Sequence, residues 1–381
     1  MVEMENDRPD LFSTVQTAWE LGPFHPGLPG PMALKLQLDG EMITGVHCES
    51  GFFHRGVEKA IELQQWYSVM PYADRIDSET ALFTELAVCL AVEEIAGLQV
   101  SPRANRIRVT LCELNRISAH LGALLRIAKT VELETVMHYV LRDREKILDL
   151  FELISGSRFN LNYFRFGGVA TDITDGFIER VSEVCDLIRT RVREYQDLFT
   201  SNHIFQRRSA GVGLLHPEVV RRYGITGPDA RASGVVSDMR KSAPYSGYEE
   251  FEFQVPVGSG EGDRLGGVHD RVVVRLREIV QSVDIIRQAI ENIPVGEYRA
   301  VKELFDFKVP EGEAYSRVEG ARGVLAVHAV SDGGNTPYRL QVRGGSKALL
   351  QAVPEILVGQ WVGDFPLILA SLDISVGEAD R

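Results

Sequence analysis

One histidine lies in a stretch of glycine and proline near the start of the chain, GPFHPGLPGP at residues 22–31. This stretch is too interrupted for a helix, and the proline rings fix φ, so Pro26, Pro29 and Pro31 leave its backbone few conformations. His25 is therefore a candidate functional side chain on a preorganised backbone, which is the arrangement that a binding site needs.

The motif GFFHRGVEK at residues 51–59 places His54 and Arg55 between an expected hairpin and an expected helix. A guanidinium close to the amino end of a helix suits an anion or the carboxylate of a partner protein. The alternative is that Arg55 only braces the start of the helix.

The motif MPYADRIDSE at residues 70–79 places Asp74, Arg75 and Asp77 within one turn. An arginine between two carboxylates is most often part of a structural ion-pair cluster. Taken alone, this motif predicts an ion-pair cluster rather than a catalytic site.

Two glycine-rich segments do not match the common nucleophile and nucleotide motifs. Residues 231–263 form a long irregular segment, which is typical of functional or interface-forming loops, but their Ser and Gly spacing fits neither a nucleophile elbow nor a P-loop. The double glycine in FRFGGVATD, residues 164–172, lacks the strand, turn and helix of a dinucleotide fingerprint. Nucleotide binding is therefore not expected.

The spacing of histidine and cysteine predicts no metal site. The nine histidines are scattered without an H-x-x-x-H pair, and no two cysteines are spaced as C-x-x-C. We expect all four cysteines to be small buried apolar residues in a reducing compartment: Cys48, Cys89, Cys112 and Cys185.

The composition is that of a globular protein with an acidic surface. The chain has 381 residues, of which 44% are hydrophobic and 25% charged, so one large body or two joined subdomains are expected. The formal net charge of -13 argues against nucleic acid as a partner. No run of about 18 apolar residues suggests a membrane span, and the acidic start MVEMENDRPD does not read as a signal peptide.

Two segments alternate apolar and polar residues on both sides of a turn and predict antiparallel hairpins. The first covers residues 30–50 around Asp39-Gly40, and the second covers residues 322–344 around Asp332-Gly333-Gly334. One hairpin lies near each end of the chain.

The region between the hairpins has a helical period. Apolar residues recur at three-and-four spacing in five segments, the third of which is long enough for two or more helices: 56–69, 77–98, 103–156, 175–202 and 271–293. Gly97, Gly156 and Pro294 signal helix ends, and Thr174-Asp175 is a plausible N-cap. The predicted fold class is α+β, with a central helical bundle flanked by small antiparallel sheets from the N-terminal and C-terminal segments.

From about residue 20 to residue 381, the chain resembles the 49-kDa subunit of NADH-quinone oxidoreductase (complex I). The blocks that carry the resemblance occur in the same order and spacing: GPFHPG, GFFHRGVEK, MPYADRID, LAVEEI, RVTLCELNRISAHL, RDREKILDLFELISGSRF, NYFRFGGVATD, RASGVVSDMRKSAPYSGY, VSDGGNTPYRLQVR and ASLDISVGEADR. The resemblance implies an N-terminal extension, residues 1–19, and a single domain, residues 20–381. Within this domain we expect a hairpin region (20–56), a helical bundle (57–226), a loop and helix (227–300) and a C-terminal hairpin region (301–381).

This family is related to the large subunit of nickel-iron hydrogenases, whose metal is held by two pairs of cysteines near the two ends of the chain. The corresponding segments here, ADRIDSE and SLDISVGEADR, contain no cysteine, so no nickel-iron centre is expected. In complex I the emptied cavity is the pocket for the quinone headgroup. The resemblance therefore implies a quinone as substrate and no cofactor bound by this chain.

The resemblance also implies residues for the quinone pocket. HPGLPG corresponds to the family's H-P-S-T-H-G loop, which puts His25 at the first histidine, Pro29 at the second, quinone-binding histidine, and Gly30 beside it. Ser78 stands where the family has a tyrosine ligand, and Thr130 stands where it has an acid. The usual His, Tyr and Asp are thus replaced, although two-electron reduction of a quinone needs proton donors.

Two further residues are expected near the terminal iron-sulfur cluster of a partner subunit. Arg75 corresponds to the cluster-facing arginine, and Asn160 stands at the position of a histidine near the cluster.

The implied partners are the other subunits of a complex I-type enzyme: the iron-sulfur cluster subunit, a 30-kDa-type subunit and the membrane arm. The chain would then be peripheral, on the cytoplasmic side of the membrane. The alternative is a divergent paralogue with a structural or assembly role in a related membrane oxidoreductase complex and no quinone chemistry.

Overall fold

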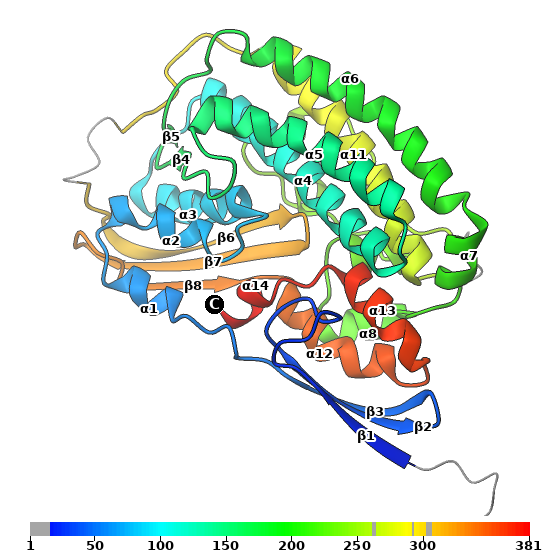
Figure 1. The fold of residues 1–381 in the computed structure, drawn as a ribbon. Helices are drawn as coiled ribbons and strands as arrows, with labels where there is room; N and C mark the ends of the chain where they lie inside the picture. The colour runs from blue at the N-terminus through cyan, green and yellow to red at the C-terminus, as the bar shows by residue number, and fades with distance from the viewer. Residues whose placement is uncertain (1–15, 261–263, 292, 302–306) are drawn as a thin grey trace, which may run out of the picture.

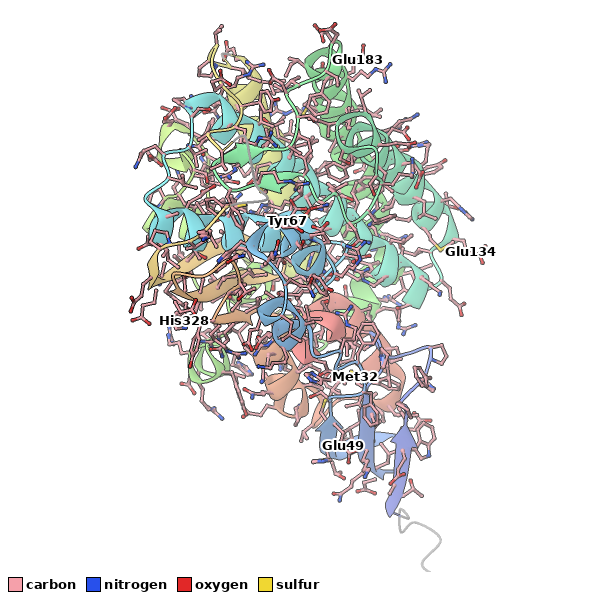
Figure 2. The ribbon with its side chains drawn as sticks, turned by 90° about the vertical axis from the view of Figure 1, so that its left-hand side faces the viewer. Met32, Glu49, Tyr67, Glu134, Glu183 and His328 are labelled. Carbon is pink, nitrogen blue, oxygen red and sulfur yellow. The ribbon has the colours of Figure 1, made fainter. Side chains whose placement is uncertain are left out.

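The computed structural model describes residues 16–260, 264–291, 293–301 and 307–381. Figure 1 shows a bundle of long helices above one three-stranded sheet, and a second three-stranded sheet that extends below the body. In the perpendicular view of Figure 2, Met32 and Glu49 mark this lower sheet, while Glu134 and Glu183 lie on the bundle. The predicted α+β class, with a bundle between two small antiparallel sheets, is confirmed.

The sheets are antiparallel and follow chain order. The N-terminal sheet contains β1 (Gln16–Leu21), β2 (Ala33–Asp39) and β3 (Met42–Glu49). The C-terminal sheet contains β6 (Glu311–Gly320), β7 (Gly323–Asp332) and β8 (Arg339–Arg343). Two short strands of two residues each, β4 (Phe164–Arg165) and β5 (Gly168–Val169), form a separate antiparallel pair.

Both predicted hairpins are confirmed, and each sheet gains one strand that was not expected. In β2, Leu34, Leu36 and Leu38 are buried while Lys35 and Gln37 are exposed, so its alternation covers one face of the core. The unexpected strands are β1 and β6. The strand β1 runs across the expected boundary between residues 19 and 20.

Five long helices contain most of the bundle: α3 (Ala81–Ala96), α4 (Pro102–Thr130), α5 (Glu134–Ser155), α6 (Phe177–Tyr195) and α11 (Val268–Glu291). The shorter helices are α1 (Val57–Glu62), α2 (Met70–Asp74), α7 (His203–Ser209), α8 (Pro217–Tyr223), α9 (Pro228–Ala232), α10 (Met239–Ser242), α12 (Ser346–Leu357), α13 (Phe365–Leu372) and α14 (Val376–Asp380). Single turns are η1 (Trp66–Ser68), η2 (Gln196–Thr200), η3 (Tyr248–Glu250) and η4 (Val362–Asp364).

The ends of the central helices follow local chemistry. Gly97 and Gly156 end α3 and α5 with φ of 63° and 76°, a left-handed conformation that glycine adopts without steric cost. Ser101 caps α4 by accepting a hydrogen bond from the Ala104 amide at 3.1 Å. The expected N-cap at Thr174-Asp175 is wrong, because Gly176 holds that position in a left-handed conformation without a side-chain cap.

Helix α4 is the centre of the bundle and packs against α5, α11 and α13. Because α11 lies against α4 and α6, it belongs to the same bundle. The expected separation of residues 227–300 from the bundle at 57–226 therefore divides one packed unit. Helix α3 lies on the β6 and β7 strands, and α12 packs against β3, so the helices also connect the two sheets.

Charged side chains of α4 are buried together with countercharges from distant segments. The carboxylate of Glu113 accepts hydrogen bonds from Arg116 (3.1 Å), Arg240 (3.0 Å), Tyr248 (2.7 Å) and Ser282 (2.6 Å). Burial acts to raise the pKa of Glu113, but Arg116 and Arg240 outweigh it and lower the pKa to about 2. This carboxylate therefore joins α4, α10, η3 and α11 in the core.

We predict that Glu113→Gln lowers the free energy of unfolding at neutral pH by about 3–5 kcal/mol, because the buried Arg116 loses its carboxylate partner and the buried Arg240 keeps only Asp238. The folded-state pKa of Glu113 is depressed, so its contribution is present above about pH 4.5 and is lost as the pH falls toward about 2. Denaturant unfolding measured over this range should show the difference between the two proteins shrinking. The exposed Glu313 gives the control, and Glu313→Gln should stay within about 0.5 kcal/mol of the parent.

Candidate functional site

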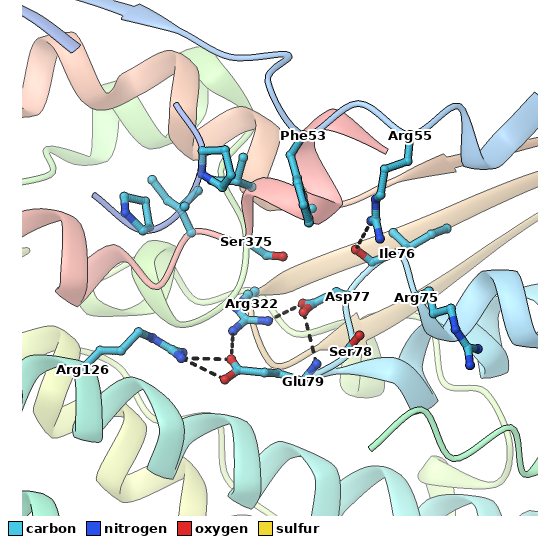
Figure 3. Close-up of a pocket in the computed structure, with 16 residues that line it drawn as sticks. Phe53, Arg55, Arg75, Ile76, Asp77, Ser78, Glu79, Arg126, Arg322 and Ser375 are labelled. Atoms are coloured by element: carbon cyan, nitrogen blue, oxygen red, sulfur yellow. Dashed lines mark hydrogen bonds and ion pairs between the residues drawn. The ribbon is translucent and has the colours of Figure 1, made fainter. Parts of the chain in front are cut away.

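A cavity of about 310 Å³ lies where three segments of the chain meet (Figure 3). One wall is the β1–β2 loop, the second is the segment between α2 and α3, and the third is the start of α14. The lining residues are Pro29, Gly30, Pro31, Phe53, Arg55, Arg75, Ile76, Asp77, Ser78, Glu79, Arg126, Arg322, Ile374, Ser375, Val376 and Gly377. The volume is at the lower end of the range of about 300–1,000 Å³ for small-molecule sites.

Backbone hydrogen bonds within the β1–β2 loop hold its shape. The Leu28 amide donates to the His25 carbonyl at 3.0 Å, and the Met32 amide donates to the Pro23 carbonyl at 3.2 Å. Gly30 lies against α14, where a Cβ would be 3.0 Å from Cγ2 of Val376. The absence of a side chain at Gly30 thus lets the loop approach the C-terminal wall closely.

An ion-pair network forms the floor of the cavity, and Arg322 is its centre. Arg322 pairs with Asp77 and Glu79 of the α2–α3 segment, and its Nε lies 3.2 Å from Asp373 Oδ2. These carboxylates come from segments near opposite ends of the chain. Figure 3 shows Asp77 and Glu79 directed toward Arg322.

Arg126 on α4 completes the network. Its Nη1 donates to both carboxylate oxygens of Glu79 at 3.0 Å, and it also pairs with Asp373. Burial acts to raise the pKa of Glu79, but Arg126 and Arg322 outweigh it and hold the pKa well below its ordinary value. Both lining carboxylates, Asp77 and Glu79, are therefore committed to arginines.

Two other lining arginines are not held by carboxylates among the described residues. Arg55 extends from the segment before α1 toward the carbonyl of Ile76, to which its Nη2 donates at 3.4 Å. The side chain of Arg75 is exposed, points away from the middle of the cavity and donates to the Pro71 carbonyl at 2.6 Å. The expected ion-pair cluster of Asp74, Arg75 and Asp77 is therefore wrong. Asp77 pairs with Arg322, whereas Asp74 lies apart from this network and accepts a hydrogen bond from the Asn162 amide at 2.7 Å.

Comparison with known proteins identifies the family. A sequence model of the respiratory-chain NADH dehydrogenase 49 Kd subunit matches residues 131–307 and 301–381. A D-type subunit of NADH-quinone oxidoreductase from Opitutus terrae is 39% identical over 395 aligned residues, which cover 97% of this chain and 92% of that protein. The corresponding subunit from Dehalococcoides mccartyi is 41% identical (95% and 97% covered), and that from Clostridium beijerinckii is 39% identical (99% and 100% covered).

The chain belongs to the 49-kDa subunit family of respiratory-chain NADH dehydrogenase. The resemblance inferred from the sequence motifs is thus confirmed, and with it membership in a family whose named relatives are subunits of an oxidoreductase complex.

The structure brings four of the expected site residues to the one cavity. Pro29 and Gly30 from the β1–β2 loop lie across from Ser78 and Arg75 of the α2–α3 segment. In the part of the chain that the structure describes, the hydroxyl of Ser78 has no hydrogen-bond partner.

His25 lies on another side of the same loop. It lines a neighbouring hollow of about 400 Å³ with Phe24, Pro26, Gly30 and Pro31. Its Nδ1 accepts a hydrogen bond from the Gly27 amide at 3.1 Å, which places the proton of the neutral ring on Nε2. The structure therefore does not place His25 among the residues that line the 310 Å³ cavity.

Thr130 and Asn160 are also outside that cavity. The Thr130 hydroxyl donates to the Arg126 carbonyl at 2.9 Å near the end of α4, so it is Arg126, one turn earlier, that reaches the site. Asn160 lines a separate hollow of about 10 Å³, which shares Ser78 and Glu79 with the main cavity. Its backbone is left-handed, with φ of 53°.

The motif at residues 51–59 is tied to α14. The carboxylate of Asp380 accepts hydrogen bonds from the amides of Gly51 (2.8 Å) and Phe53 (3.0 Å). His54 Nδ1 donates to the Asp380 carbonyl at 2.7 Å. His54 is thus part of this connection, while Arg55 faces the cavity.

The described part of the long segment, residues 231–260, contributes to the core rather than to the cavity. Arg231 is fully buried and pairs with Glu278 (2.6 Å) and Glu319 (2.7 Å). Arg240 is also buried and pairs with Glu113 and Asp238. The short helices α9 and α10 supply these buried cations to the bundle, which the sequence motif did not indicate.

The free cysteines do not lie at the cavity. Cys89, Cys112 and Cys185 are buried as expected, whereas Cys48 is half-buried. Across the described ranges, no His, Cys, Asp and Glu side chains gather in a group of three that suits a metal ion. Within those ranges, no helix has the length and apolar character that would allow it to cross a membrane.

The contact between Gly30 and Val376 allows a test of whether the β1–β2 loop packs closely against α14. Gly30→Val would overlap Val376 and should lower the free energy of unfolding by about 1–3 kcal/mol. Combining it with Val376→Ala should recover about 0.5–3 kcal/mol relative to the sum of the two single changes. Chemical denaturation of the four proteins measures this coupling, and additive losses would contradict the contact.

A matched control comes from Gly363, where a Cβ would meet no atom within 4 Å. Gly363→Val should show no coupling with Val376→Ala.

Proposed function

We propose that this chain is the quinone-module subunit of an NADH-quinone oxidoreductase, and that its 310 Å³ cavity receives the quinone headgroup. The observation that carries the proposal is the meeting of Pro29 and Gly30 with Ser78 in one cavity. These are positions that the family resemblance implies for the quinone site, although they are remote from one another in sequence. The relatives named above are themselves subunits of NADH-quinone oxidoreductases.

The two segments that correspond to the hydrogenase cysteine positions support this proposal. Residues 75–79 and 374–377 face the same cavity, as expected for an inherited metal cavity that has lost its thiolates. Neither segment contains a cysteine. Half of the lining residues are apolar or glycine, and the Ser78 and Ser375 hydroxyls and Arg55 are hydrogen-bond donors, a combination that suits an organic headgroup with carbonyl oxygens.

The chain's own contribution to the chemistry would be to bind and orient the headgroup. The stiff β1–β2 loop restricts one side of the cavity, and the Ser78 hydroxyl is available to donate a hydrogen bond to a carbonyl oxygen. No His or Tyr is among the lining residues, and a serine hydroxyl is far too weak an acid to replace them. The two protons of quinol formation would therefore come from water in the cavity.

The electrons would come from an iron-sulfur cluster held by a partner subunit. Arg75 points outward from the cavity wall and is exposed, as expected of a residue that meets a partner near such a cluster. The 30-kDa-type subunit and the membrane arm complete the proposed set of partners. We place the subunit on the cytoplasmic side of the membrane, as a peripheral part of the complex.

Filling the cavity tests this assignment. Ser78→Trp in the assembled complex should lower NADH-quinone reductase activity at least about tenfold, because the indole would occupy the headgroup space. Electron transfer from NADH to a small water-soluble acceptor such as ferricyanide should be unchanged. The control is Ser201→Trp at an exposed position. Full quinone activity in Ser78→Trp would show that the acceptor binds elsewhere.

Replacing Arg75 tests the position of the partner's cluster. Arg75→Ala should lower the midpoint potential of the nearest cluster by an amount on the order of tens of millivolts, because a positive charge that favours the reduced cluster is lost. Arg75→Lys keeps the charge and should preserve most of the potential. The potentials are read by redox titration with EPR detection. An unchanged potential in Arg75→Ala would remove Arg75 from the surroundings of the cluster.

A second candidate is a structural or assembly subunit without quinone chemistry. The absence of His and Tyr from the cavity lining favours it. In that case Ser78→Trp would leave the activity of the native complex unchanged while the subunit remained assembled.

A further inference from the structure

The charges that line the cavity are not balanced. The carboxylates of Asp77 and Glu79 are taken up by Arg322 and Arg126. Arg55 has no carboxylate partner among the described residues. Because Arg322 and Arg126 also bind Asp373, the network holds three carboxylates against two guanidinium groups, and neither arginine is free for a ligand. The lining cation that can bind a ligand in the cavity is Arg55.

The guanidinium of Arg55 is held in place by neutral contacts. It lies 4.7 Å from the centre of the Phe53 ring, within the range of a cation–π interaction. A Cβ on Gly377 would be 3.4 Å from Arg55 Nη2 and 3.3 Å from Phe53 Cε1, so α14 closes the side of this pair. Figure 3 shows Phe53 and Arg55 extending from the same segment toward the cavity.

A purely structural role accounts poorly for this arrangement. Gly56 is the N-cap of α1, and Arg55 makes no cap to that helix. Its one hydrogen bond to another described residue, the Ile76 carbonyl at 3.4 Å, is at the long end of the accepted range. The alternative that Arg55 braces the start of the helix is therefore not supported.

The electrostatics of Arg55 favour an anionic ligand. Burial lowers the pKa of Arg55, and the nearby charge of Asp77 opposes this effect. A guanidinium stays protonated in proteins, so the cost of its partial removal from water is offset when an anion binds.

We propose that Arg55 binds the headgroup oxygen that carries negative charge, so that the cavity prefers an anionic headgroup to a neutral one of the same shape. This inference rests on the proposed function of the cavity as the quinone site. Conversion of a quinone to a quinol takes two electrons, supplied by the partner's iron-sulfur cluster, and two protons, supplied by water. The oxygen is negative until its proton arrives, and Arg55 is the donor that stabilises it in a cavity lacking Tyr and His.

A pair of naphthoquinones that differ in charge tests the proposal on the assembled complex. The 2-hydroxy compound is ionised at neutral pH, whereas the 2-methoxy compound is neutral and of nearly the same shape. Inhibition constants against the quinone substrate should favour the ionised compound by about 10- to 100-fold, the range of one hydrogen bond to a charged group. Arg55→Gln should bring the ratio near one, and Arg55→Lys should keep part of it. Arg317→Gln, which removes an exposed arginine of β6 outside the cavity lining, should leave the ratio unchanged.

The outcomes separate this inference from the proposed function. If neither compound competes with the quinone, the cavity is not the quinone site and both proposals fail. If the wild-type complex binds both compounds equally well, the role of Arg55 is wrong while the pocket assignment stands, and this comparison needs no variant to assemble. A preference that survives in an assembled Arg55→Gln complex would also overturn the role of Arg55.

Discussion

The guanidinium of Arg322 is the contact on which the cavity depends. It lies between β6 and β7 and binds Asp77, Glu79 and Asp373, so that one side chain fixes the α2–α3 segment and the C-terminal segment relative to the sheet. Buried ion pairs contribute little net stability, because desolvation costs about as much as the attraction returns. Their geometry is nevertheless strict. Here it sets the distance between the α2–α3 segment and the C-terminal segment, two walls of the cavity that are remote in sequence.

The ion pairs of Arg322 and Arg126 also determine which polar groups of the cavity wall remain available to a ligand. Because the acidic groups of the floor are neutralised by Arg322 and Arg126, the cavity offers little to a cation. Its remaining polar groups include the hydroxyls of Ser78 and Ser375 and the guanidinium of Arg55, all of which can donate. A carbonyl-bearing ring that gains negative charge fits such a surface, and this supports a quinone site despite the missing tyrosine and histidine.

The sequence predicted the parts of the fold that depend on local chemistry. Turn residues marked both hairpins, and Gly97 and Gly156 marked the ends of α3 and α5. The strands β1 and β6 and the helices α12 to α14 were not expected; β1, α13 and α14 have only six, eight and five residues, too few for a clear period. At the site, motif correspondence found Pro29, Gly30 and Ser78. It could not find the pairing of Asp77 with Arg322, since no spacing along the chain reports a contact between residues 245 positions apart. Thr130 matched a family position by order, yet it is not among the residues that line the cavity, and its hydroxyl donates to the Arg126 carbonyl.

The Asp380 carboxylate binds the amides of Gly51 and Phe53, just ahead of the arginine that faces the cavity. Through these bonds α14 and the segment before α1 form one mechanical unit. A neighbouring protein that presses on the exposed segment at residues 51–55 would therefore shift the Phe53–Arg55 pair and the residue 374–377 wall together. Docking of such a neighbour could in this way tighten or widen the ligand space without any contact inside it.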